Sequence, residues 1–352
     1  MKQLSSNTLA PSSNQSWFMG NGKIHKSRIF YKTFSGGKYN YSFMFTNTID
    51  STFSDGSHSQ ADLACDSWEI VSLGAYITKS ITNDLNHSDK LNITFNDKKS
   101  KIVISKEIIY SDLIELECEK NDYICLEIEF RGDGRIPYME EMMIPSFVLQ
   151  NGEWTECKET PLCASVLCDR KVDKRIGFFG DSITEGIGVE KNSYNWWCAQ
   201  IAELVGDKYS YWDIGIGFGR AMDGALKGAW LNKAKMLDEL TVCFGVNDIC
   251  QGFSEETVKN SINTIVNELK NANKRVILFT IPPFDYDESK EKIWRNINDY
   301  IKNTLSKKVE VFDVVPIWGC DAPYEHKARY GGHPNEEGSL LLAKKFVQKI
   351  KL

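Results

Sequence analysis

Short apolar runs separated by turn residues dominate the first half of the chain. Residues 39–45 (YNYSFMF) alternate apolar and polar side chains with a period of two, and residues 91–95 (LNITF) repeat the pattern. Further apolar runs cover residues 102–104 and 123–130, and clusters of Ser, Gly, Asn and Asp lie between the runs. Many short strands without helical periodicity are typical of a β-sandwich or jelly roll. We therefore expect residues 1–165 to form an N-terminal all-β sandwich domain.

The second half alternates short apolar runs with longer helical segments. The runs have the length of buried strands and cover residues 175–179, 209–216, 240–244, 275–280 and 309–312. Helical periodicity is clearest over residues 255–271, 287–304 and 336–349. Strands that alternate with helices indicate βαβ units around a parallel sheet. We expect an α/β domain over residues 175–352, joined to the first domain by a charged stretch near residues 165–174.

Composition narrows the class of protein. The 42 Lys and Arg against 48 Asp and Glu give a net charge of −6, which argues against nucleic acid as a partner because phosphate neutralisation needs a basic surface. Apolar runs are too short to cross a membrane, and the polar N-terminus lacks the apolar segment of a secretory signal. The 10 cysteines have irregular spacing without a C-x-x-C pair. We expect a cytoplasmic protein with reduced thiols, no metal site, no other cofactor and no membrane partner.

A serine flanked by glycines follows the first strand of the α/β half. Residues 180–186 read GDSITEG, so Ser182 lies where a strand ends and a helix begins. In open α/β folds, ligands bind outside the carboxyl ends of the strands. Thr184 replaces the second glycine of the G-x-S-x-G nucleophile elbow, so the motif differs from that of the α/β-hydrolases. Taken alone, the heptapeptide is better explained as a turn with a helix-capping Ser.

Three further motifs lie at the same predicted edge. Residues 213–220 (DIGIGFGR) form a glycine-rich turn that can offer backbone N–H groups to an anion, and Asn247 ends the third strand in GVND. His333 stands in GGHPN, immediately before the last helix. A tight turn, a helix cap and a surface histidine are the ordinary explanations for each motif taken singly. Together they set aside the capping explanation for Ser182, because His333 lies at another edge of the βα type, where it could face Ser182.

These four blocks resemble those of the SGNH (GDSL-type) hydrolases over roughly residues 175–350. The resemblance implies a flavodoxin-like three-layer α/β/α domain and ester hydrolysis through an acyl-enzyme. Carried over by position, Ser182 is the nucleophile and His333 its general base. The oxyanion hole combines the Ser182 backbone N–H, a glycine of the second block and the Asn247 side chain. Gly217 is our choice for that glycine, with Gly219 as the alternative.

One position departs from the family pattern. Members commonly carry Asp three residues before the histidine, where this chain has Tyr330. Carbohydrate esterase family 2 is similar in lacking that Asp, in using a Ser–His dyad oriented by a backbone carbonyl, and in placing a β-sandwich ahead of the SGNH domain. We therefore predict a dyad, while Asp321 and Glu325 remain open as carboxylates that orient His333.

Substrate clues are fewer. Five aromatic residues lie near the motifs: Trp196, Trp197, Trp230, Trp318 and Tyr330. Such residues could stack on sugar rings or pack in the core. We predict a serine esterase that removes acetyl groups from oligosaccharides. A short-chain or lysophospholipid esterase is the alternative in the same class, and a non-catalytic carbohydrate-binding protein derived from an esterase is the alternative in another. The sequence leaves the sugar, the acetyl position and the oligomeric state open.

Overall fold

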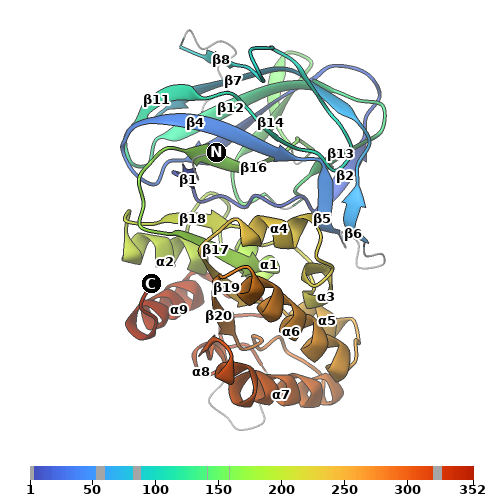
Figure 1. Cartoon of the computed structure of the whole chain (residues 1–352), viewed down its shortest axis with the longest axis vertical. Coiled ribbons are helices and arrows are strands. Elements are labelled where there is room, and N and C mark those ends of the chain that lie inside the picture. Colours follow the sequence, from blue (N-terminus) through green and yellow to red (C-terminus); the bar gives the residue numbers. More distant parts are fainter. Residues whose placement is uncertain (1–3, 53–59, 82–88, 141, 158, 320–326) are drawn as a thin grey trace. The chain divides into compact units, whose positions relative to one another are not determined.

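The computed structural model describes residues 4–52, 60–81, 89–140, 142–157, 159–319 and 327–352 (Figure 1). The chain divides into two compact units. The first comprises Met1–Asp50, Leu63–Asp173 and Ser210–Trp212, and the second comprises Ser51–Asp62, Lys174–Tyr209 and Asp213–Leu352. The predicted domain bounds of 1–165 and 175–352 stay a prediction.

The first unit is built from antiparallel strands. One sheet has the order β1-β16-β4-β10 with β11 also paired to β4, and a second has the order β15-β14-β3-β12-β7-β8 with β9 also paired to β7. Two-stranded pairs are β13 with β2 and β5 with β6. The strands are β1 (Ser5–Ser6), β2 (Ser16–Met19), β3 (His25–Lys32), β4 (Gly37–Thr46), β5 (Thr48–Thr52), β6 (Gln60–Ala64), β7 (Trp68–Thr78), β8 (Leu91–Ile93), β9 (Lys101–Val103), β10 (Ile108–Tyr110), β11 (Ile114–Cys118), β12 (Tyr123–Arg131), β13 (Arg135–Tyr138), β14 (Ser146–Gln150), β15 (Glu153–Glu156) and β16 (Cys163–Cys168).

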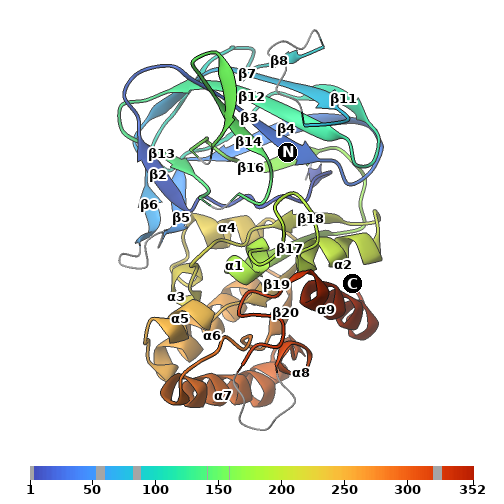
Figure 2. The same cartoon turned by 180° about the vertical axis from the view of Figure 1, so that it is seen from behind.

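The centre of the second sheet is buried on both faces. Phe30, Cys125 and Tyr76 are cross-strand partners on β3, β12 and β7, and each is at most 2% exposed. The neighbouring row, Ile29, Leu126 and Ala75, points to the opposite face and is 0% exposed throughout. A sheet that is covered on both sides belongs to a sandwich, and Figures 1 and 2 show the two sheets lying one over the other. The predicted all-β sandwich is confirmed.

A parallel sheet has the order β18-β17-β19-β20-β21, and all of its strands except β18 lie wholly in the second unit. Numbered along the chain, this is the 2-1-3-4-5 order of flavodoxin-like folds. The strands are β17 (Arg175–Gly180), β18 (Ser210–Asp213), β19 (Glu239–Cys243), β20 (Arg275–Phe279) and β21 (Glu310–Phe312). The helices are α1 (Ser182–Glu185), α2 (Trp197–Val205), α3 (Ala221–Gly224), α4 (Ala229–Lys235), α5 (Val246–Cys250), α6 (Glu255–Asn271), α7 (Glu288–Asn303), η1 (Leu305–Lys307), α8 (Val315–Trp318) and α9 (Glu336–Lys349).

Neighbouring residues of β17 show how helices cover both faces of this sheet. The Phe178 ring packs against Trp197 of α2 at a centroid distance of 5.3 Å. The next residue, Phe179, points to the other face and packs against Trp230 of α4 at 4.9 Å. Helix α9 packs beside α2, and α6 lies on the side of α4 (Figures 1 and 2). The predicted three-layer α/β/α domain is confirmed.

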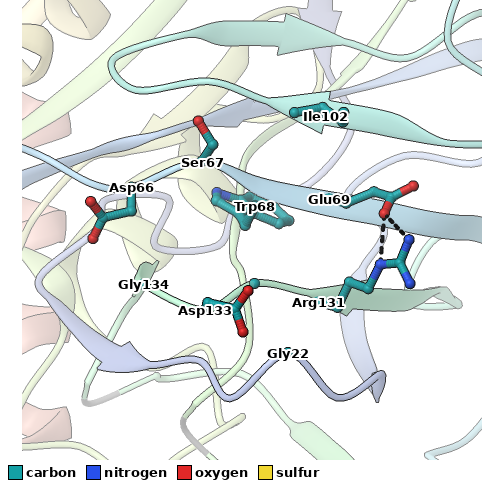
Figure 3. A pocket seen from close by; sticks show the side chains of 10 residues that line it. Gly22, Asp66, Ser67, Trp68, Glu69, Ile102, Arg131, Asp133 and Gly134 are labelled. Carbon is teal, nitrogen blue, oxygen red and sulfur yellow. Dashed lines mark hydrogen bonds and ion pairs between the residues drawn. The ribbon is translucent and has the colours of Figure 1, made fainter.

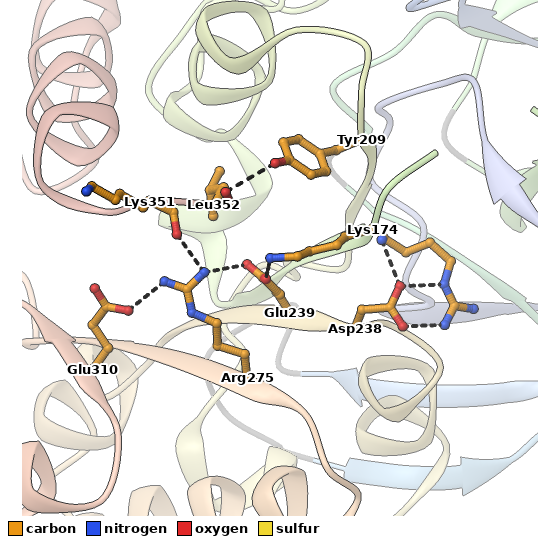
Figure 4. A network of polar contacts seen from close by, with 9 residues as sticks. Lys174, Tyr209, Asp238, Glu239, Arg275, Glu310, Lys351 and Leu352 are labelled. Carbon is orange, nitrogen blue, oxygen red and sulfur yellow. Dashed lines mark hydrogen bonds and ion pairs between the residues drawn. The ribbon is translucent and has the colours of Figure 1, made fainter. Parts of the chain in front are cut away.

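A polar network joins the amino ends of the strands to the C-terminus (Figure 4). Glu239, at the start of β19, is 3% exposed and forms ion pairs with Lys174 and with Arg275 of β20. Arg275 also pairs with Glu310 of β21 at 2.7 Å and donates to the carbonyl oxygen of Lys351 at 2.7 Å. This network holds the edge of the sheet that lies opposite the predicted site.

Candidate active site

The four motifs of the sequence analysis meet at one point of the parallel sheet. Strand order reverses between β17 and β19, because β18 lies on one side of β17 and β20 lies beyond β19. Ser182 follows the carboxyl end of β17, and Asn247 follows that of β19. A reversal of strand order leaves a crevice at the carboxyl ends of the two central strands, which is where open α/β folds bind ligands.

Ser182 is the first residue of the four-residue helix α1. The helix is capped by Asp181, whose Oδ1 accepts a hydrogen bond from the Ile183 N–H at 3.0 Å. Because Asp181 performs the capping, the Ser182 hydroxyl is left for another partner. That partner is His333, whose Nε2 lies 2.8 Å from Ser182 Oγ. Both residues are half-buried, so the pair remains accessible to a small molecule.

His333 reaches the serine from the turn that precedes α9. The cap of that helix is Asn335, whose Oδ1 accepts the Gly338 N–H at 3.0 Å, and not His333. Its imidazole contacts the ring of Phe284 at a centroid distance of 5.4 Å and an interplanar angle of 85°. Phe284 follows β20 and carried no signal in the sequence, since a lone phenylalanine in a Pro-rich loop forms no recognisable motif.

Asn247 approaches the glycine-rich turn. Its Nδ2 donates to the carbonyl oxygen of Gly219 at 3.0 Å, and the Gly219 N–H donates to the Ile216 carbonyl oxygen at 3.1 Å. The Gly219 N–H is therefore engaged within the turn. Within the described residues, no backbone hydrogen bond is donated by the Gly217 N–H. Between the two glycines, Phe218 has a left-handed φ of 58°, an unusual conformation for an aromatic residue.

Asp248 fixes the other end of that turn. Its Oδ2 accepts the Ala221 N–H at 2.8 Å and its Oδ1 accepts the Met222 N–H at 3.3 Å. Burial raises the pKa of Asp248 to about 6. The adjacent residues Asn247 and Asp248 thus hold the turn and the start of α3 from one short helix, α5.

Two more carboxyl groups are buried beneath the site. Burial raises the pKa of Asp181 to about 7, with a smaller contribution from the nearby Asp248 carboxylate. Burial also raises the pKa of Asp213 to about 7, although its oxygens accept the Gly215 N–H at 2.9 Å and the Trp196 indole N–H at 3.0 Å. These groups organise the loops behind Ser182 and are drawn toward the neutral form.

The candidate orienters Asp321 and Glu325 lie outside the described residues. Tyr330, in the place where the family carries Asp, is half-buried, and its carbonyl oxygen accepts the Asn335 N–H at 3.1 Å. The choice between a dyad and a triad stays a prediction.

The tryptophans near the motifs are core residues. Their exposed fractions are 1% for Trp196, 0% for Trp197, and 2% for both Trp230 and Trp318. Each indole N–H has a partner within its own unit: Trp197 donates to the Ile183 carbonyl oxygen at 2.9 Å, for example. A buried ring cannot stack on a sugar, so the core-packing alternative is correct for these four residues.

A second hollow lies in the β unit and has a volume of about 700 Å³ (Figure 3). It is lined by the ion pair of Glu69 with Arg131, at 2.7 Å, and by the exposed carboxylates of Asp66 and Asp133. Its aromatic residue, Trp68, is only 2% exposed and donates to the Asn47 side chain at 3.0 Å. The lining includes a serine, Ser67, but no histidine, so it does not reproduce the Ser182–His333 pair, and the buried Trp68 offers no open aromatic face.

Among the described residues, no group of three or more His, Cys, Asp and Glu side chains is placed to hold a metal ion. None of the helices in the described ranges has the length and apolar character needed to span a membrane.

Three solved structures to which the chain is similar have at most 20% sequence identity with it. A member of the lipolytic protein G-D-S-L family from Veillonella parvula has 20% identity, a TM-score of 0.41, and covers 50% of this chain and 97% of its own. The M. smegmatis aryl esterase has 16% identity and a TM-score of 0.40, and the match covers 50% of this chain and 97% of the esterase. A family two carbohydrate esterase from Clostridium thermocellum, solved as an active-site mutant, has 10% identity and a TM-score of 0.41. The match covers 99% of this chain and 97% of that esterase.

The family comparison is more specific. No curated protein matches the chain. Residues 178–341 match the model of the GDSL-like lipase/acylhydrolase family, and this range contains all four motifs. Residues 178–341 therefore carry a domain of the GDSL-like lipase/acylhydrolase type.

Proposed function

We propose that this protein is a serine esterase that removes acetyl groups from acetylated oligosaccharides through an acyl-enzyme. The observation that carries the proposal is the 2.8 Å contact between Ser182 Oγ and His333 Nε2 at the reversal point of the sheet. A serine hydroxyl within hydrogen-bond reach of an imidazole nitrogen is the arrangement that nucleophilic acyl transfer requires.

In the proposed mechanism, Ser182 Oγ attacks the ester carbonyl carbon as His333 Nε2 takes the hydroxyl proton. The resulting oxyanion is met by the Ser182 and Gly217 backbone N–H groups and by Asn247 Nδ2. That amide nitrogen carries two hydrogens, and its bond to Gly219 uses one of them. Collapse of the intermediate breaks the bond to the sugar oxygen, which leaves with the proton from His333. Water, deprotonated by the same imidazole, then releases acetate and restores Ser182.

The choice of an acetylated sugar as substrate rests on the sequence pattern. Tyr330 in the place of the usual Asp, and a β domain ahead of the hydrolase domain, are features in which the chain is similar to carbohydrate esterase family 2. We place the enzyme in the cytoplasm, acting on imported oligosaccharides. In support, the nine cysteines of the described ranges are all free of disulfides, as is usual where thiols stay reduced.

Acetate release tests the proposal directly. Purified protein is incubated with acetylated mannan, xylan and pectin oligosaccharides, and in parallel with 4-nitrophenyl acetate and a lysophospholipid, with Ser182→Ala as the control. Acetate released from a sugar by the wild type alone supports the proposal. Hydrolysis of the lysophospholipid in preference to the sugars identifies the alternative esterase. Sugar binding without hydrolysis of any ester identifies the non-catalytic alternative.

A further inference from the structure

The imidazole of a general base must be held in one orientation. Rotation about the bond between the β-carbon and the ring is a broad torsion, so the side chain alone does not keep Nε2 directed at a partner. His333 Nε2 lies 2.8 Å from Ser182 Oγ, a distance that a modest rotation of the ring would lengthen. The protein therefore needs contacts that restrict this rotation.

The ring of Phe284 makes such a contact. Its centroid lies 5.4 Å from that of His333, and the two planes are 85° apart, the edge-to-face geometry that aromatic rings prefer. The backbone beside His333 is fitted to the same ring, because a Cβ on Gly332 would lie 2.9 Å from Phe284 Cε2. Gly188 approaches His333 from another loop, where a Cβ would lie 2.9 Å from the His333 Cβ.

Phe284 can act as a rigid support because its loop is anchored before and after it. Ile281 donates its N–H to Asn298 Oδ1 at 2.7 Å and accepts hydrogen bonds from Asn298 Nδ2 at 3.0 Å and from the Trp294 indole at 2.8 Å. The Tyr286 ring is 1% exposed and packs on Trp294 at 5.9 Å. The proline pair between these anchors, residues 282–283, restricts the backbone further.

The loop also holds the segment that carries the histidine. Asp285 Oδ1 accepts the Ala328 N–H at 2.9 Å, five residues before His333. Phe284 and Asp285 thus connect the loop after β20 to the imidazole and to its backbone. Asn298 and Trp294 extend this connection to helix α7.

We propose that Phe284 is a positioning residue that keeps the His333 imidazole oriented toward Ser182. The inference rests on the proposed function. It assigns the orientation of the base to packing against an aromatic ring, in addition to whatever hydrogen bond the imidazole makes. A ring held in place by packing stays aligned while the proton moves to Nε2 and back, which the two half-reactions of an acyl-enzyme mechanism both need.

The test compares Phe284→Leu with Phe284→Tyr. Turnover of 4-nitrophenyl acetate, a small ester without sugar contacts, is the readout. Leu removes the ring, and we expect kcat to fall about 10- to 100-fold with KM within about twofold. Tyr keeps the ring, and because Phe284 is half-buried its hydroxyl can point to solvent, so kcat should stay within about threefold of the wild type. Should the Leu variant not fold, Phe284→Met carries the same test.

Phe346→Leu is the matched control. Phe346 is 0% exposed and packs on Phe279 and Phe312. Its loss should lower the melting temperature without lowering kcat. Wild-type kcat in Phe284→Leu, an equal loss of kcat in Phe346→Leu, or an equal loss in Phe284→Tyr would overturn the positioning role. Absence of turnover in the wild type would instead overturn the proposed function itself.

Discussion

The hydroxyl of Ser182 lies 2.8 Å from Nε2 of His333, although 151 positions of sequence separate the two residues. Parallel strands explain how this distance is closed, because β17 and the last βα connection both deliver their following residues to the carboxyl edge of one sheet. Close backbone packing completes the approach: Gly188, with φ of 107°, stands where any Cβ would lie 2.8 Å from the His333 carbonyl oxygen. Activity should therefore depend on residues at this edge.

Replacing Asn247 by Ala should lower kcat about 10²- to 10³-fold and leave KM nearly unchanged, as expected for a donor used mainly in the transition state. Steady-state kinetics on 4-nitrophenyl acetate measure both constants. Because Asn247 also donates to Gly219, the melting temperature of the variant should be recorded alongside. A rise in KM with unchanged kcat would assign Asn247 to ground-state binding and remove it from the oxyanion hole.

If a dyad operates, Asp321→Asn and Glu325→Gln should each cost about tenfold or less in kcat, whereas His333→Ala abolishes turnover. The reason is that a backbone carbonyl holding the imidazole cannot be removed by a side-chain substitution. Where a carboxylate does orient the catalytic histidine, its amide replacement costs about 10⁴ in kcat, as in the serine proteases. A loss of that size in either variant, with an intact fold, would identify the third member of a triad.

The predicted dyad rests on the sequence, since Tyr330 takes the place of the family's usual Asp. Sequence patterns also predict much of the fold. Helices α6 and α9 have the predicted bounds of 255–271 and 336–349, because their apolar periodicity is unbroken and Ser254 and Asn335 cap them. Strand β8 ends at Ile93, two residues before the predicted end, because Phe95 and Lys98 pair across a tight turn at residues 96–97.

Other features of the site depend on contacts that no local pattern records. From the sequence alone, Trp196 and Trp197 could pack in the core or contact a ligand. Their contacts with Asp213 and Phe178 show that they are core residues. The two glycines of the second block look alike in sequence, and only the turn geometry shows that the Gly219 N–H is already engaged. Phe284 reaches His333 across two separate βα connections, so its contact is a product of tertiary structure alone.

The buried carboxyl of Asp181 predicts a stability that depends on pH. Its pKa is raised to about 7, so between about pH 4 and 7 the folded protein binds a proton that the unfolded chain has released. Stability from this group is therefore present at low pH and is lost as the pH rises through 7. In Asp181→Asn the loss is absent, since Asn bears no charge and its oxygen can still cap Ile183.

Urea unfolding at pH 5 and pH 8 checks this linkage. Relative to the wild type, the Asp181→Asn variant should gain about 2–3 kcal/mol of unfolding free energy between the two pH values. Any cost of burying the amide hydrogens of the new side chain is the same at both pH values, so it cancels from the difference in unfolding free energy between them. An equal change in unfolding free energy for the wild type and the variant would show that folding does not raise the pKa of the Asp181 carboxyl group.

Glu239 should stabilise the amino ends of the strands of the parallel sheet. Its side chain is 4% exposed and pairs with Lys174 and Arg275, so Glu239→Gln should cost about 1–3 kcal/mol of unfolding free energy. Glu310→Gln is the matched control: its side chain is 39% exposed, and its loss should cost less than about 1 kcal/mol. Both variants should keep full esterase activity, and equal costs for the two would contradict the role given to Glu239.

Covalent labelling of the nucleophile is the most direct test of the account. The wild type and Ser182→Ala are each treated with a serine-reactive phosphonate, and the adduct is located by mass spectrometry of the peptides. We predict one adduct per chain, on Ser182, formed in step with the loss of esterase activity, and no adduct on the folded Ala variant. An adduct on another serine, or full esterase activity in Ser182→Ala, would contradict the assignment of Ser182 as the nucleophile.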